Sequence, residues 1–190
     1  MVIEAIVERG TKPGPASFHA LLFARVDEQD LASCTPEDLH RLGEAAYFHQ
    51  EKMRPHRKAE ITLFDEAVSG VGHRQEITVL EVINDNMPFL LDSTLAELTE
   101  QGFKPLLVAH PILAVERDAE GRLQRVAADA PGQLPAGLRR ESFLHIHLDR
   151  IDSDAMRARL TEGLATVYRD VAVAVGDWVV RVCLSPKSHR

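Results

Sequence analysis

Residues 77–103 read ITVLEVINDNMPFLLDSTLAELTEQGF, and this stretch decides the fold. It opens with an apolar run rich in β-branched residues, from Ile77 to Ile83, which predicts a strand. The apolar residues that follow recur at helical spacing, which predicts a helix: Leu91, Leu95 and Leu98. Gly102 stands where a helix ends in a left-handed residue. The stretch is therefore a strand, a turn and a helix without interruption.

The turn between this strand and helix carries short polar side chains and a proline. Asn84, Asp85 and Asn86 favour turns and helix caps because their side chains hydrogen-bond to nearby backbone. Pro88 suits the first turn of a helix, where its missing N–H costs nothing. We therefore expect the helix to begin at Pro88 under a cap from Asp85 or Asn86.

The remaining chain divides into elements by the same patterns. Before the central stretch we expect two helices and a strand, then a polar loop, at 18–25, 36–52, 59–64 and 65–75. After it we expect two strands joined by a turn, a Pro/Gly-rich loop, another strand and a final helix, at 104–117, 122–126, 128–138, 141–149 and from 152 on. Pro111 cannot donate a ladder hydrogen bond, so a bulge or an edge position is expected there. The final helix ends at Gly176, leaving 178–184 as a strand, or it continues.

Composition limits the class of protein. The chain has 190 residues, a formal net charge of −7 and two cysteines without metal-site spacing. An apolar content of 45% with 27% charged residues is typical of a globular protein. We predict a cytoplasmic protein with reduced thiols that binds neither nucleic acid nor membrane. The one basic cluster, 54–58, is interpreted as a solvated helix end.

Three segments together resemble a known family: NDNMPFLLDS at 84–93, HPILAVERDAEG at 110–121 and RESFLHIHLDR at 140–150. They are similar to the N-terminal, ACT-like region of the large bacterial NAD-specific glutamate dehydrogenases. The resemblance implies an α+β, ferredoxin-like fold, an antiparallel sheet with helices on one face, preceded by a small helical segment. We expect the helical segment at 1–58 and the ACT-like domain at 59–190.

The same resemblance implies a function. The chain would be a regulatory or assembly region without catalysis or cofactor of its own, contacting the rest of the parent polypeptide and other subunits. The parent enzyme would oxidatively deaminate glutamate to 2-oxoglutarate and ammonium with NAD. The alternative is a free-standing ACT-type module that senses an amino acid. The sequence does not identify the effector or its effect, activation or inhibition, and it does not give the oligomeric state.

A ligand site is expected at the central turn. Five residues gather near the predicted helix N-terminus, where free amides and the helix dipole attract an anion or a carboxylate: Asn84, Asp85, Asn86, Pro88 and Asp92. The general ACT pattern has glycine at the position of Phe89, and a Phe would obstruct the close approach of a ligand. The simpler interpretation is that Asp85 or Asn86 only caps the helix.

Histidines suggest a second candidate site. His145 and His147 point the same way from one strand and, with His110 from another, could ligate a metal in a hydrolase. The simpler interpretation is that they lie on the less buried face of the sheet. Since no cysteine or acidic residue completes the set, we predict no metal.

The last expectation concerns the two faces of the strand at 141–149. Three residues face one side, Leu144, Ile146 and Leu148, and three face the other, Phe143, His145 and His147. Both long helices are needed on the leucine side, so we expect the Phe143 face to dock another subunit or the parent chain. The alternative is that the N-terminal helices fold across it.

Overall fold

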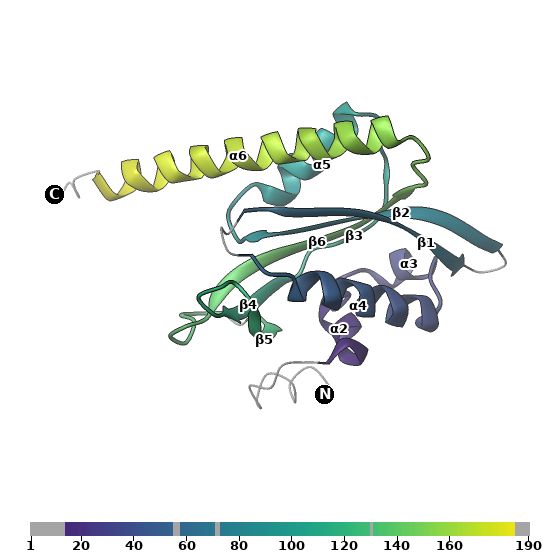
Figure 1. Ribbon diagram of the computed structural model, residues 1–190, viewed down its shortest axis with the longest axis horizontal. Helices are drawn as coiled ribbons and strands as arrows, with labels where there is room; N and C mark the ends of the chain where they lie inside the picture. Colours follow the sequence, from purple (N-terminus) through teal and green to yellow (C-terminus); the bar gives the residue numbers. More distant parts are fainter. Residues whose placement is uncertain (1–13, 55–57, 71–72, 130, 185–190) are drawn as a thin grey trace.

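The computed structural model describes residues 14–54, 58–70, 73–129 and 131–184. Its elements in chain order are α2 (Pro15–Leu22), α3 (Glu28–Leu31), α4 (Pro36–Glu51), β1 (Glu60–Gly70), β2 (His73–Asp85), α5 (Leu90–Glu100), β3 (Pro105–Ala109), β4 (Ile112–Arg117), β5 (Leu123–Ala128), β6 (Arg139–Asp149) and α6 (Asp154–Leu184). Figure 1 shows three layers, with α5 and α6 on one side of the sheet and α2, α3 and α4 on the other. The predicted α+β fold with a helical segment before the sheet is confirmed.

The sheet is antiparallel and is organised around β6. One edge of β6 pairs with β2 along its length, and the other edge pairs with β4 and then β3, giving the order β1-β2-β6-β4-β5. The predicted strand at 104–117 is broken at Pro111, as its missing N–H requires. The Pro111 carbonyl still accepts a hydrogen bond from the Phe143 N–H, at 3.1 Å.

One face of the sheet is covered by α5 and α6 through apolar contacts. The buried residues come from both helices, from β2 and β6, and from the connection between β6 and α6: Leu80, Val82, Leu90, Leu98, Leu144, Ile146, Leu148, Ile151, Leu160, Leu164 and Tyr168. The helix α5 ends as expected at a left-handed Gly102, with φ of 83°, and the Phe103 N–H bonds back to the Leu98 carbonyl. The leucine side of β6 is thus the core predicted from its alternation.

The other face is covered by α2 and α4, so the expectation that it docks a partner is wrong. Phe143 is fully buried, and its ring centroid lies 6.0 Å from that of Phe18 on α2. The helices α2 and α4 cross closely at Gly43, where an added Cβ would sit 2.4 Å from the Cβ of His19. The predicted start of α4 is confirmed, since Thr35 and Asp38 form a reciprocal capping box.

Two further elements differ from the expectation or complete it. The predicted loop at 65–75 is mostly strand, because β1 runs to Gly70 and pairs residue by residue with β2. Asp65 at the start of this segment is hydrogen-bonded in the sheet, because its carboxylate accepts from the Thr78 hydroxyl of β2 at 2.8 Å. The final helix continues through Gly176 to Leu184, so 178–184 is helix and not strand.

Candidate functional site

The central turn differs from its prediction. The strand β2 continues through Asp85, which pairs with Glu141 of β6, and α5 begins only at Leu90. The residue at the N-cap position is Phe89, which makes no side-chain cap hydrogen bond. The predicted helix start at Pro88 under an Asp85 or Asn86 cap is therefore wrong. Pairing with β6 holds Asp85 in the sheet, and this tertiary pairing outweighs the local preference for a turn.

Phe89 has an unusual backbone conformation. Its φ of 69° and ψ of 0° lie in the left-handed region, and among the described residues it alone does so without being glycine. Pro88 before it suits the first corner of a type II turn, whose second corner needs a positive φ. The side chain is 66% exposed. The turn thus keeps the backbone shape that glycine would supply in the general ACT pattern, with a phenyl ring added at its surface.

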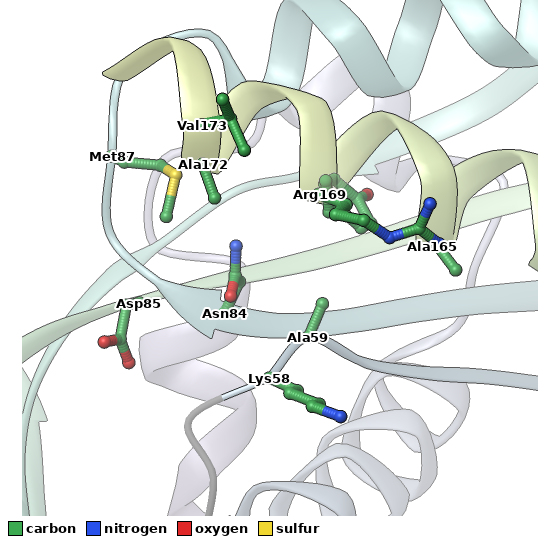
Figure 2. A pocket seen from close by; sticks show the side chains of 10 residues that line it. Lys58, Ala59, Asn84, Asp85, Met87, Ala165, Arg169, Ala172 and Val173 are labelled. Atoms are coloured by element: carbon green, nitrogen blue, oxygen red, sulfur yellow. The ribbon is translucent and has the colours of Figure 1, made fainter. Parts of the chain in front are cut away.

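A cleft of about 700 Å³ opens beside this turn, between the end of β2 and α6 (Figure 2). Of the five predicted ligand residues, Asn84 and Asp85 line it, whereas Asn86, Pro88 and Asp92 do not. The other lining residues come from the entrance to β1, from the turn and from α6: Lys58, Ala59, Met87, Ala165, Tyr168, Arg169, Ala172 and Val173. The cleft is therefore built between the sheet and α6, and not at the N-terminus of α5.

Asp85 belongs to a buried ionic cluster behind the cleft. Its carboxylate lies 3.6 Å from the guanidinium of Arg54, which is itself 2.6 Å from the Glu141 carboxylate. Glu141 also accepts from Arg117 at 2.8 and 2.9 Å and from Gln50 at 2.8 Å. Burial would raise the pKa of the Glu141 carboxyl, but the hydrogen bond from Arg117 and the two guanidinium charges outweigh burial and lower it.

The interpretation of residues 54–58 as a solvated helix end is wrong for Arg54, which belongs to the buried ionic cluster. Arg54 is 3% exposed, so it is not part of a solvated helix end. Lys58 is exposed at the cleft. Residues 55–57 lie outside the described residues.

A second buried network joins α4, β2 and β6. The Glu81 carboxylate contacts His49 on one oxygen and lies 2.7 Å from Nδ1 of His145 on the other. The Nε2 atoms of His145 and His147 are 2.9 Å apart. Burial would raise the pKa of Glu81, but the hydrogen bonds from His145 and His49 lower it below its usual value. The prediction that these histidines lie on a less buried face is wrong, since His145 is 0% and His147 2% exposed.

The histidine arrangement offers no metal centre in the described part of the chain. No group of three His, Cys, Asp or Glu side chains there is suited to hold an ion. His110 is hydrogen-bonded through Nε2 to the Ser142 hydroxyl at 2.5 Å. His145 and His147 are bonded to each other. They belong to the buried polar network that joins α4 to the sheet.

Sequence reasoning missed most of the polar residues that matter here: Gln50, Arg54, Arg117, Glu81, Glu141, Lys58 and Arg169. One signal was present. Glu81 interrupts an apolar strand, and a carboxylate in such a position is buried and therefore needs a partner, whereas Glu141 stands between polar residues and lacks that signal. Their partners lie 24 to 91 residues away in the sequence, so local patterns could not identify them.

The fold and the site together define the class. A six-stranded antiparallel sheet carries a strand–turn–helix unit with proline and a left-handed residue at the turn, which is an ACT-like α+β domain. The chain belongs to the family described as "Glutamate dehydrogenase, ACT1 domain", whose model matches residues 18–164.

Two proteins with similar sequences are both named NAD-specific glutamate dehydrogenase. The protein from Halomonas elongata is 31% identical over 162 residues, which are 85% of this chain and 10% of the relative. The protein from Pseudomonas aeruginosa is 25% identical over 119 residues, 63% of this chain and 7% of the relative. The chain thus spans about a tenth or less of each relative's length. No solved structure matches it, and none of the described helices is long and apolar enough to cross a membrane.

Proposed function

We propose that this chain acts as a regulatory and assembly region of an NAD-dependent glutamate dehydrogenase. The observation that carries the proposal is the match of the ACT1 family over residues 18–164. Both relatives bear the name of that enzyme, which favours the dehydrogenase region over a free-standing amino-acid sensor. The whole enzyme would oxidise glutamate to 2-oxoglutarate and ammonium, with the rest of the polypeptide supplying the chemistry.

Among the described residues, the turn between β2 and α5 does not have the features of an NAD site. A dinucleotide fold places the pyrophosphate on a glycine-rich turn between a strand and a helix. The turn between β2 and α5 is Asn86-Met87-Pro88-Phe89, without a glycine, and its helix follows a strand of an antiparallel sheet. NAD therefore belongs to the parent enzyme in this proposal, and no chemical step is assigned to this chain.

The proposed partners are the rest of the parent polypeptide and neighbouring subunits. Docking through the Phe143 face no longer supports assembly, because α2 and α4 cover that face. Exposed apolar side chains elsewhere remain available, among them Phe89 at 66% and Val173 at 62% exposure. The cytoplasmic location, and the absence of nucleic-acid and membrane partners, stay predictions from composition.

The test uses the whole dehydrogenase together with this chain alone. The isolated chain should show no glutamate-dependent NAD reduction. In the whole enzyme, Leu144→Asp should unfold this region, since Leu144 is 1% exposed in the apolar core. The variant should therefore differ from the unmodified enzyme in the mass of its oligomer or in its response to effectors. Arg74→Gln, at an exposed site, is the matched control. Turnover by the chain alone, or a Leu144→Asp enzyme with unchanged mass and regulation, would overturn the proposal.

A further inference from the structure

The cleft between the end of β2 and α6 contains a buried amide that is not used by the fold. Asn84 is 6% exposed, and in Figure 2 its side chain rises from β2 into the space below α6. Its amide makes no hydrogen bond with any of the described residues. Asn84 therefore offers a hydrogen-bonding group to whatever enters the cleft.

The cleft also has a local positive charge in a chain whose net charge is −7. Arg169 reaches it from α6 and Lys58 from the chain that enters β1. Neither side chain forms an ion pair with the described residues. The one carboxylate in the lining, Asp85, lies 3.6 Å from Arg54 of the buried ionic cluster. Among the residues that the structure describes, Lys58 and Arg169 thus line the cleft without an ion-pair partner.

Small and apolar side chains make the helical wall of the cleft. Ala165 and Ala172 lie two turns apart on α6, and their size leaves the space open. Tyr168 lies between them, and its hydroxyl is engaged by Thr94 of α5 at 2.7 Å, so only its ring is available to a ligand. Met87 and Val173 complete the apolar wall. A volume of about 700 Å³ is within the usual range for small-molecule sites.

We infer that this cleft binds a small organic anion, with its carboxylate or phosphate held by Arg169 and Lys58, its polar edge by Asn84 and its apolar part against α6. Guanidinium and ammonium groups without a protein counter-charge are the usual donors to both kinds of anion. Within the proposed function, the cleft is the place where an effector acts.

Calorimetric titration of the 190-residue chain at constant ionic strength tests the inference. The probes are 2-oxoglutarate and L-glutamate for carboxylates, and AMP and inorganic phosphate for phosphates. At least one organic probe should bind saturably with one site per chain. Arg169→Gln and Lys58→Gln should each weaken that binding about tenfold, the loss of one charge-assisted hydrogen bond. Arg159→Gln, on α6 but outside the cleft lining, should leave it unchanged.

Two pairs of variants separate binding from stability. Ala172→Phe should fill the cleft and abolish binding, whereas Ala174→Phe, exposed on the same helix, should not. Asn84→Ala should lose binding without loss of unfolding free energy, because no internal hydrogen bond is removed. If no probe binds, or if binding survives Ala172→Phe, the inference is wrong. Since these titrations need no dehydrogenase activity, their outcome is independent of the test of the proposed function.

Discussion

Beneath α5 and α6 the buried side chains of the sheet are leucine, isoleucine and valine, whereas beneath α2 and α4 an apolar core that includes Phe143 lies beside two buried carboxylates, Glu81 and Glu141. The first face holds its helices mainly through apolar area, and the buried hydrogen bond between Thr94 and Tyr168 joins α5 to α6 and not to the sheet. The second face holds α4 through specific partners, because His49 and Gln50 of that helix contact those two carboxylates. The two faces therefore differ in how strictly the covering helices are positioned. Apolar contacts tolerate sliding, while a buried ion pair is satisfied in one register.

Glu141→Ala should have the largest effect on stability. It leaves the guanidinium groups of Arg54 and Arg117, whose side chains are 1% and 2% exposed, without their carboxylate. Removing one partner of a buried pair costs about 3–5 kcal/mol. Urea denaturation measures the loss of unfolding free energy. Glu120→Ala, in an exposed pair with Arg122, is the control and should cost less than about 1 kcal/mol. Equal costs would mean that the buried cluster does not hold α4.

The next largest effect should come from the apolar face. Leu160 of α6 is fully buried against the sheet, and Leu160→Ala should cost about 3 kcal/mol through lost burial and the cavity left behind. Met156→Ala, at a 40% exposed position of the same helix, should cost less than about 1 kcal/mol. The cost of Leu160→Ala should also be the same at pH 6 and pH 8, since no titrating group is involved. A strong pH dependence would contradict the distinction between the faces.

A smaller effect is a pH dependence of the free energy of unfolding, which comes from the polar face. Burial, and next to it the charge of His145, lower the pKa of His147 well below 6.5. The unfolded chain therefore binds a proton where the folded chain does not, so the free energy of unfolding should fall as pH decreases through about 6.5. His147→Gln should make this decline shallower in urea titrations between pH 8 and 5.5. His40→Gln, at a half-exposed position, is the control.

The buried carboxylates do not titrate in this pH range and so do not contribute to the decline. The lowered pKa values of Glu81 and Glu141 mean that their stabilisation is present above about pH 4.5 and is lost only below it. Identical pH profiles for His147→Gln and the unmodified chain would refute the assignment to His147.

The smallest predicted effect is at the turn. Phe89→Gly should stabilise the chain by about 1 kcal/mol, because glycine adopts the left-handed conformation without strain and the exposed ring contributes little packing. Asn86→Ala should change stability by less than about 0.5 kcal/mol, since Asn86 is exposed and does not cap α5. Thermal denaturation measures both. A destabilised Phe89→Gly would mean that the ring has a structural role at this turn.

Local patterns predicted one face of the molecule far better than the other. Alternation in β6 and helical spacing in α5 and α6 identified the apolar face, since those signals lie within single elements. The covering of Phe143 by Phe18 joins residues 125 positions apart, and no period in the sequence reports such a contact. For the candidate site, Asn84 and Asp85 line the cleft, but they do so from the end of β2 and not from a turn, and their predicted role in ligand binding stays a prediction. The cations Lys58 and Arg169 were missed because only the packing of α6 over the strand ends brings them there.

The central position of β6 has a consequence for the order in which the chain folds. Three other strands, β2, β3 and β4, complete their hydrogen bonding only on β6, which is the last strand in the sequence. During synthesis, the β1–β2 hairpin and the N-terminal helices must therefore wait until residue 149 has left the ribosome before the sheet can close. At about 5–20 residues per second, this exposes the β2 edge and the surface that will cover Phe143 for several seconds. In the cell, this interval is when the nascent chain is most open to chaperones and to pairing with a neighbouring copy.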